Sequence, residues 1–302
     1  MTPVDLVGIG TNSIDHVVML PAPLADIAAS GKARMLARRA MAGGQTATTA
    51  CACARLGLRA RYAGVFGSDD EGRRIRETLQ AHDIDIADAI EYDGPNRHAV
   101  ILVDPEGCRT VLWHRAEHAA FPSARVHQAI SGARIVHVDD DDPALALAAA
   151  QAAAAARIPV TSDLEHVDEA IERLIAAVTH PIFDHNAPRA ITGSSDPETA
   201  LRKLRRITAS VLCMTLGDAG CVALDGDRLH VAPAFRVTVV DNTGAGDVFR
   251  AGYIYGLLQG WDVPHRLRFA NAAAAISCTR LGAIPSVPSL REVEELLEKK
   301  RN

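Results

Sequence analysis

Short apolar runs separated by helical stretches set the pattern of hydrophobic and polar positions along this chain. The first run, residues 4–10, is predominantly apolar and ends in glycine, which is typical of a strand buried in a parallel sheet. Later apolar runs alternate with helical stretches, and we expect strands at residues 135–138, 160–162, 181–183 and 211–215. This alternation predicts an α/β fold in which a doubly wound parallel sheet carries helices on both faces.

Glycine and alanine positions mark the expected helices. The Gly-Gly pair at residues 43–44 opens an alanine-rich helix that Gly57 ends. A strand at residues 61–66 precedes a helix at residues 71–82. The alanine run at residues 144–156 also predicts a helix, because alanine has the highest helix propensity of all residues.

Two β-rich segments interrupt this α/β pattern. One contains an expected strand at residues 16–20, and the other contains apolar runs at residues 98–104 and 109–114 around a Pro-Glu-Gly turn, which predicts a hairpin. We expect residues 12–42 and 94–115 to form a small β-sheet that lies over the core as a lid. The core then comprises residues 1–11, 43–93 and 116–302.

Composition narrows the class of protein. The chain has 302 residues, of which 48% are hydrophobic and 23% charged, and its formal net charge is −5. These values fit a globular protein with a substantial core, and they lack the concentrated basic field of a nucleic-acid-binding protein. No apolar run is long enough for a transmembrane helix, the N-terminus lacks the basic region of a secretory signal, and the six cysteines form no CxxC pair. We therefore expect a cytoplasmic protein with reduced thiols in its core.

A glycine-rich turn at residues 241–247 carries the strongest chemical signal. An apolar run at residues 235–240, expected to be a strand, enters this turn, and a helix is expected from Asp247 to about Gln259. Glycine lets the backbone approach a ligand closely, and the first amides of a helix lack internal partners at the positive end of its dipole. The combination predicts an anion site suited to phosphate. Asp247 either serves there as a general base for an attacking hydroxyl or only caps the helix.

The string DNTGAGDVF at residues 241–249 resembles the second signature of the ribokinase/PfkB family of carbohydrate kinases, whose usual form is DTTGAGDxF. The resemblance implies a ribokinase-like fold, MgATP as phosphoryl donor and a hydroxyl group of a small sugar as acceptor. It also implies that Asp247 is the catalytic base and that the amides of Gly244, Ala245 and Gly246 form the anion hole. Within the family, fragments along the chain are most similar to ketohexokinases and bacterial sulfofructose kinases.

The family resemblance covers nearly the whole chain and assigns acceptor contacts near the N-terminus. Asp15 matches the aspartate that binds sugar hydroxyls, with a solvated surface carboxylate as the alternative. The segment AGGQTATTA resembles the family's first signature, a Gly-Gly turn into a helix. The expected acceptor residues in this segment are Gly43, Gly44, Gln45 and Thr48. The family commonly has an asparagine at the position of Thr48.

The resemblance assigns nucleotide and cation contacts to the second half of the chain. The expected ATP contacts are Asp184, Thr215, Gly217, Gly220, Asn271 and Ala274. Asp184 aligns with the start of the family's N-x-x-E motif, whose glutamate position holds Ala187 here, and it is expected to order water on magnesium. A monovalent cation such as potassium is expected at the loops that contain Asp241, Thr243, Ala283 and Ser286.

Four consecutive aspartates follow an expected core strand and precede Pro143. Asp142 is expected to cap the next helix, with Pro143 at its first position. Asp139, Asp140 and Asp141 either support the structure or line the acceptor site, since ligands bind at the carboxyl ends of parallel strands. If these side chains face the acceptor, their charges disfavour an anionic sugar, and we include Asp139 among the expected acceptor contacts.

Together these patterns predict a ribokinase-like kinase that uses ATP and Mg²⁺ and accepts a neutral ketohexose such as fructose. A nucleoside kinase of the same fold stays open, although aromatic residues, which would line a purine slot, make up only 4% of the chain. A catalytically silent sugar-binding protein would have lost the base or the anion hole, and both motifs are present. We expect no nucleic-acid or membrane partner, and the resemblance implies a homodimer paired through the lid.

Overall fold

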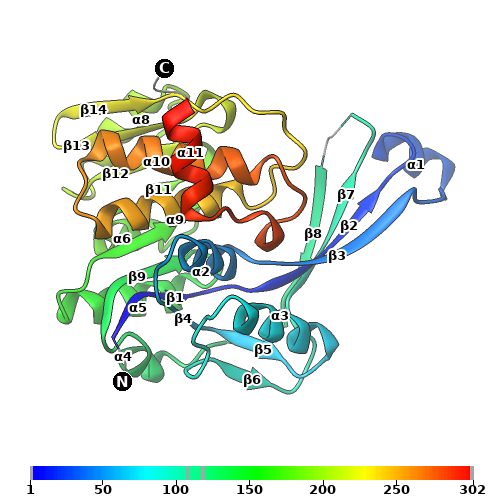
Figure 1. The fold of residues 1–302 in the computed structure, drawn as a ribbon, viewed down its shortest axis with the longest axis horizontal. Coiled ribbons are helices and arrows are strands. Elements are labelled where there is room, and N and C mark those ends of the chain that lie inside the picture. Colours follow the sequence, from blue (N-terminus) through cyan, green and yellow to red (C-terminus); the bar gives the residue numbers. More distant parts are fainter. Residues whose placement is uncertain (1–2, 107–108, 117–119, 300–302) are drawn as a thin grey trace.

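A central sheet organises the core of the protein (Figure 1). The structure, a computed structural model, describes residues 3–106, 109–116 and 120–299. The strands of the sheet are β1 (Val4–Ile9), β4 (Ala60–Ala63), β9 (Ala133–Asp139), β10 (Val160–Asp163), β11 (Ile182–Phe183), β12 (Leu212–Thr215), β13 (Cys221–Asp225) and β14 (Arg228–Ala232). β10, β9, β1 and β4 are parallel neighbours in that order, and isolated parallel bridges join β10 to the segment around β11. β11 and β12 are parallel, and β13 and β14 continue as an antiparallel edge.

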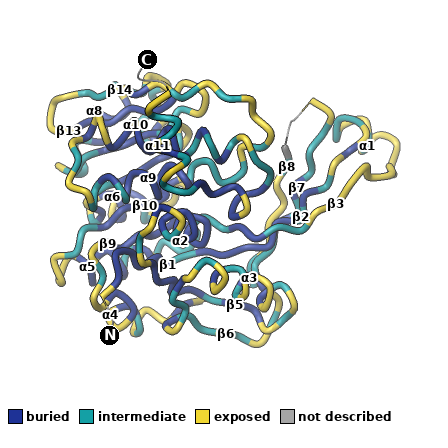
Figure 2. The backbone as a smooth tube through the Cα atoms, in the orientation of Figure 1, coloured by how far each residue is buried: buried dark blue, intermediate teal, exposed yellow. Residues whose placement is uncertain are grey.

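Helices cover both faces of this sheet, which confirms the predicted fold class. One face carries α2 (Gln45–Arg55), α9 (Ala245–Leu258), α10 (Val263–Ser277) and α11 (Leu290–Lys299). The other carries α4 (Val126–Ala129), α5 (Pro143–Ala155), α6 (Ile171–Ala177) and α8 (Pro197–Leu204). Successive side chains of a strand point to opposite faces. Leu6 of β1 therefore packs in the hydrophobic core on the side of α2 and α9, and Val7 packs in the core on the side of α5 and α6. Figure 2 shows the central strands, α2 and α9 as the most deeply buried parts of the chain.

A second sheet projects from the side of the core (Figure 1). It consists of β2 (Ser13–Met19), β3 (Ala37–Gly43), β7 (His98–Val103) and β8 (Arg109–His114), in the order β3-β2-β7-β8, and α1 (Leu24–Ser30) lies at its far end. The predicted hairpin is present, with β7 and β8 antiparallel and His98 opposite His114. Gly107 of its turn lies outside the described residues. We call this sheet the lid; the exact boundaries drawn for it from the sequence stay a prediction.

Asp142 and Pro143 begin α5 as the sequence predicted. The Asp142 side chain accepts a hydrogen bond from the Leu145 amide, and Pro143 occupies the first turn. The smaller elements around the core are β5 (Val65–Gly67), β6 (Ile90–Tyr92), α3 (Asp70–Ala81) and α7 (Asn186–Thr192). Residues 61–66, predicted as one strand, therefore divide between β4 and β5 at Gly64, and β5 pairs with β6 outside the central sheet.

The predicted strand at residues 235–240 was wrong, because the chain there is irregular. Val239 and Val240 are 61% and 60% exposed, so their apolar pattern does not reflect burial in a sheet. The backbone amide of Val240 donates to the carbonyl of Cys278 at the end of α10 rather than to a neighbouring strand. A strand needs such a neighbour to satisfy its backbone groups, and none of the described strands pairs with this segment.

Within the described residues, no helix has the length and apolar character that a membrane crossing requires. Cys51, Cys53, Cys213 and Cys221 are buried, as predicted, and burial raises the pKa of the Cys213 thiol to about 12. Cys108 lies outside the described residues.

Candidate functional site

The glycine-rich turn shapes the N-terminus of α9. Gly244 is the N-cap residue and has a positive φ of 76°, and a Cβ atom there would lie 2.8 Å from that of Ala283. Only glycine suits this position on both grounds. The helix begins at Ala245, two residues earlier than predicted, so Asp247 lies inside the first turn. The Ala245 amide donates to the Asn242 carbonyl, and the next two amides, of Gly246 and Asp247, belong to the first turn, whose amides are open to an anion.

A cleft of about 800 Å³ opens between the lid and the carboxyl edge of the sheet. Its size is ordinary for a small-molecule site. Of the residues predicted for the site, it is lined by Asp15, Gly44, Gln45, Thr243, Gly244, Gly246, Asp247 and Ala283. The structure therefore brings the first and second sequence motifs together around one space, although about two hundred residues separate them along the chain.

Asp15 and Asp247 are the two buried carboxylates of this cleft, and they are 8% and 9% exposed. Burial raises the pKa of Asp15, although its Oδ1 atom accepts a hydrogen bond of 2.6 Å from the Ser13 hydroxyl. Burial also raises the pKa of Asp247 well above its ordinary value, while the charge of Arg250 opposes that shift. A carboxylate with a raised pKa is a stronger base, which suits proton transfer from a hydroxyl group.

Three predicted acceptor residues lie behind the cleft wall rather than on it. A Cβ atom on Gly43 would lie 2.4 Å from the Asp15 carboxylate, so this glycine makes room for Asp15. Thr48 is fully buried, with its methyl group 3.4 Å from where a Cβ of Gly244 would be. Asp139 is 2% exposed, and its Oδ2 atom accepts hydrogen bonds of 2.7–2.8 Å from the amide and hydroxyl groups of Thr11 and the hydroxyl group of Thr46. These three residues therefore support the site without lining the cleft.

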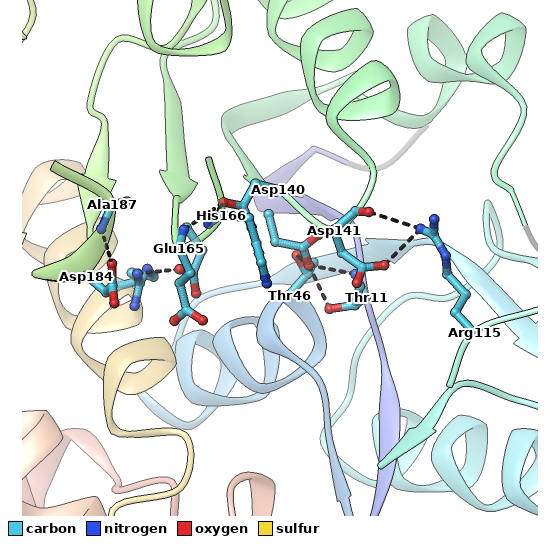
Figure 3. Close-up of polar contacts among 12 residues, drawn as sticks. Thr11, Thr46, Arg115, Asp140, Asp141, Glu165, His166, Asp184 and Ala187 are labelled. Carbon is cyan, nitrogen blue, oxygen red and sulfur yellow. Dashed lines mark hydrogen bonds and ion pairs between the residues drawn. The ribbon is translucent and has the colours of Figure 1, made fainter. Parts of the chain in front are cut away.

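The other aspartates of the acidic run also bind protein groups (Figure 3). Asp140 accepts hydrogen bonds from the amides of Glu165 and His166 and pairs with the His166 ring at 2.9 Å. Asp141 forms ion pairs with Arg97 at 3.1 Å and Arg115 at 2.9 Å. Of the two alternatives for this run, these contacts favour the structural one, because each side chain accepts from its own donors and Asp141 lies between two cations. The contact of Asp139 with the acceptor stays a prediction.

The predicted nucleotide residues gather at the other end of the carboxyl edge. Thr215 ends β12, and Gly217 lines a hollow of about 410 Å³ together with Leu216 and Asp218. Gly220 has a φ of 99°, and a Cβ atom there would lie 2.2 Å from the Ala232 carbonyl oxygen.

Two residues of this region that were predicted to contact the nucleotide form hydrogen bonds within the protein. Asn271 of α10 is 6% exposed, and its side-chain amide donates to the carbonyls of Ala232 and Pro233. Asp184 accepts hydrogen bonds from the Asn186 and Ala187 amides at the start of α7. Ala274, also on α10, is half-buried.

The two loops predicted to hold a monovalent cation lie against each other. The Oδ1 atom of Asp241 accepts hydrogen bonds from the amide and hydroxyl groups of Thr243, and its Oδ2 atom accepts one of 2.8 Å from the Gly282 amide. The fully buried Ser286 donates from its hydroxyl to the Ala283 carbonyl at 2.7 Å. Asp241 thus ties the loop before α9 to the loop after α10.

Comparisons with known proteins agree with this geometry. A family model described as pfkB family carbohydrate kinase matches residues 12–290. The chain belongs to this family. The acarbose 7(IV)-phosphotransferase of Actinoplanes sp. is 30% identical over 300 residues, which cover 94% of this chain and 95% of that enzyme. Fructokinase-1 of Zea mays is 27% identical over 297 residues, covering 85% and 88% of the two chains.

A solved structure confirms the fold of this pfkB family kinase. Arabidopsis thaliana ribokinase in complex with ribose and ATP superimposes with a TM-score of 0.86 at 23% identity, and the match covers 98% of this chain and 99% of the ribokinase. The prediction of a ribokinase-like fold is therefore confirmed.

The cleft residues of the pfkB kinase that were not predicted from the sequence include Arg97, Trp113, Glu165 and His166. Glu165 and His166 directly follow β10, and residues after the carboxyl end of a parallel strand are candidates for ligand binding on position alone. Arg97 and Trp113 belong to the lid hairpin, where nothing in the sequence pattern indicates which face meets the cleft. The Arg97 guanidinium lies 5.4 Å from the centroid of the Trp113 ring.

The ion pair between His166 and Asp140 leads to a testable prediction for the pKa of the His166 ring. Its hydrogen bond with Asp140 raises the pKa of His166 to about 9. Since this value exceeds the roughly 6.5 of an unfolded histidine, the stabilisation is complete below about pH 6.5 and is lost as the pH rises through 9. We expect NMR titration of the His166 ring to give a midpoint well above neutral that falls toward 6.5 in Asp140→Asn. Asp168→Asn, a nearby aspartate bonded to the Ala170 amide, is the matched control and should leave the midpoint in place. A wild-type midpoint near 6.5 would refute the pairing.

Proposed function

We propose that this protein transfers the γ-phosphoryl group of ATP to a hydroxyl group of a small neutral carbohydrate, with a ketohexose such as fructose as the foremost acceptor. One observation carries the proposal: the catalytic carboxylate Asp247, the open amides of the first turn of α9 and the second buried carboxylate, Asp15, meet in a single cleft. The family relation to a fructokinase and to an acarbose phosphotransferase supports a carbohydrate acceptor.

Each group has a distinct task in this proposal. Asp15 accepts hydrogen bonds from acceptor hydroxyls and orients the sugar, because an ionised carboxylate offers several acceptor positions. Asp247 accepts the proton of the attacking sugar hydroxyl. The sugar oxygen then bonds to the γ-phosphorus atom of ATP as the bond between that phosphorus and the oxygen of the β-phosphate breaks, which releases ADP. The amides of Gly246 and Asp247, at the positive end of α9, stabilise the charge on the transferring group.

Magnesium fits the nucleotide end of this site through an indirect contact. Three amide donors, two from the backbone and one from the Asn186 side chain, occupy the Asp184 carboxylate. An ionised carboxylate has about four acceptor positions, so one remains for a water molecule on the metal. Bound magnesium would neutralise charge on the phosphates. For a monovalent cation, the half-buried Asp241 carboxylate, which the amides of Thr243 and Gly282 hold between the two loops, contributes negative charge, and oxygen ligands of this kind suit a hard cation.

The charges that line the cleft favour a neutral acceptor. Asp15, Glu165 and Asp247 contribute negative charge. The two basic residues of the lining, Arg97 and His166, are each paired with an aspartate. An anionic sugar would therefore meet an excess of negative charge, and repulsion from one carboxylate costs about 1–4 kcal/mol at a separation near 4 Å.

The cleft face of the lid supports a ring-shaped acceptor. Trp113 and Val111 of β8 lie beside Ala99 and Ile101 of β7, and all four line the cleft. Trp113 is 56% exposed, so its ring is available to the apolar face of a sugar or to a nucleobase. This aromatic side chain keeps a nucleoside acceptor as the second candidate.

A homodimer paired through the lid remains part of the proposal. Leu112 points away from the cleft-facing residues of its strand, because neighbouring side chains alternate between the two faces. Leu112, Met35 and Leu36 are 58%, 52% and 69% exposed. Exposed apolar residues of this size on a projecting sheet support pairing with a second copy.

An acceptor panel tests the proposed function. We expect a coupled assay of ADP release to show turnover with fructose that exceeds turnover with ribose or adenosine. Fructose 6-phosphate should have a lower kcat/KM than fructose, because the cleft carries net negative charge. A preference for the phosphorylated sugar would contradict the neutral acceptor, and a preference for adenosine would favour the nucleoside candidate.

Asp247→Asn tests the catalytic base. The amide cannot accept the hydroxyl proton, so kcat should fall by about 10²–10⁴ while ATP affinity, measured by calorimetry, stays unchanged. Asp262→Asn makes the same chemical change at the N-cap of α10 and should retain wild-type kcat. A near wild-type rate in Asp247→Asn would remove Asp247 from the mechanism.

Trp113→Ala tests the acceptor platform on the lid. Loss of the ring should raise the KM of the acceptor by about tenfold, the equivalent of roughly 1.4 kcal/mol, and leave the KM of ATP unchanged. Leu112→Ala, the neighbouring residue on the other face of the same strand, is the control and should leave the acceptor KM in place. Equal acceptor KM values in both variants would show that the lid face does not contact the acceptor.

A further inference from the structure

An ion pair is buried beneath the first turn of α9. Arg250 is 1% exposed and is the largest of the fully buried side chains among the described residues. Its Nη2 atom pairs with Oδ1 of Asp163, which ends β10 and is fully buried. A buried ion pair loses much of its Coulombic gain to desolvation and is weak evidence for a purely stabilising role. The pair therefore calls for an explanation in terms of the site above it.

The guanidinium of Arg250 lies directly against the backbone of the anion hole. A Cβ atom built on Gly246 would be only 2.6 Å from Nη1 of Arg250. Arg250 also follows Asp247 by three residues on the same helix, a spacing that places two side chains on one face. A full positive charge, fixed by Asp163, thus lies under the amides of Gly246 and Asp247.

Several other charged and titratable groups surround this arginine. Asp163 and Glu165 come from β10 and the loop that follows it, and Asp139 and Asp140 come from the end of β9. His137 of β9 is fully buried and stays neutral, because burial lowers its pKa to about 3, and His166 is paired with Asp140. Nearby carboxylates and burial both oppose ionisation of Asp247, and the positive charge of Arg250 favours it.

We propose that Arg250, held in place by Asp163, is a positioning residue for phosphoryl transfer: it keeps the Asp247 carboxylate ionised and fixes the Gly246 backbone. Arg250 touches neither substrate in this account and acts only through these two neighbours. The inference rests on the proposed kinase reaction. It explains why position 246 is glycine although its φ is not positive, since any side chain there would displace the guanidinium.

The test compares the pH dependence of kcat in matched variants. Arg250→Met removes the charge, and Arg250→Lys retains it. Because removing one member of a buried pair strands the other, we add the double variant Arg250→Met/Asp163→Leu, whose apolar replacement of the whole pair is expected to fold. The double variant removes the negative charge of Asp163 together with the positive charge of Arg250, so their electrostatic effects on Asp247 largely offset each other and the variant isolates the loss of the guanidinium beside Gly246. Circular dichroism and thermal melting establish that each variant is folded.

Since the base must be ionised, activity falls as the pH drops through the pKa of Asp247. We expect the acidic limb of the kcat profile to move upward by about one pH unit in Arg250→Met, where only the positive charge is lost, and kcat below that limb to fall about tenfold. In the double variant the limb should move less, while kcat should still fall because the guanidinium no longer fixes the Gly246 backbone. Arg250→Lys should keep the wild-type limb. A folded Arg250→Met variant with an unshifted limb, or a folded double variant with wild-type kcat, would overturn the proposal. Lack of kinase activity in the wild type would instead contradict the proposed function itself.

Discussion

Compensation of buried negative charge at the carboxyl edge of the central sheet is the constraint on which the site depends. An isolated buried carboxylate is costly, so each one needs donors from the protein or from a ligand. Protein groups satisfy the carboxylates at the ends of β9 and β10: Asp139, Asp140, Asp141 and Asp163. Asp15 and Asp247 face the cleft instead. The fold thus leaves two carboxylates for the hydroxyl groups of an acceptor.

The position of α9 converts this arrangement into a reaction centre. The turn before the helix fits only because Gly244 adopts a left-handed conformation against Ala283. It brings the first amides of α9 to the same cleft as Asp15 and Asp247, so in the proposed reaction the donor phosphate and the acceptor hydroxyl meet at one helix end. The lid turns apolar side chains toward the same cleft, and closure of such a face over bound substrates would exclude the water that competes for the phosphoryl group.

Local patterns in the sequence predicted the parallel core, the lid hairpin and the glycine-rich turn before α9, because each depends on residues close together in the chain. The strand expected at residues 235–240 failed since pairing depends on a neighbouring strand that only the tertiary structure reveals. The directions of Asp139 and Asp141 were also beyond the sequence, because their partners Thr46 and Arg115 come from distant segments. The buried pair of Arg250 and Asp163 could not be predicted for the same reason.

A crystal structure of the protein with fructose and a non-hydrolysable ATP analogue tests the central claim most directly. The account predicts that one fructose hydroxyl lies about 2.6–3.2 Å from the Asp247 carboxylate and that the terminal phosphate of the analogue contacts the amides of Gly246 and Asp247. Fructose bound with all its hydroxyls beyond the reach of Asp247, or a terminal phosphate away from the start of α9, would contradict it.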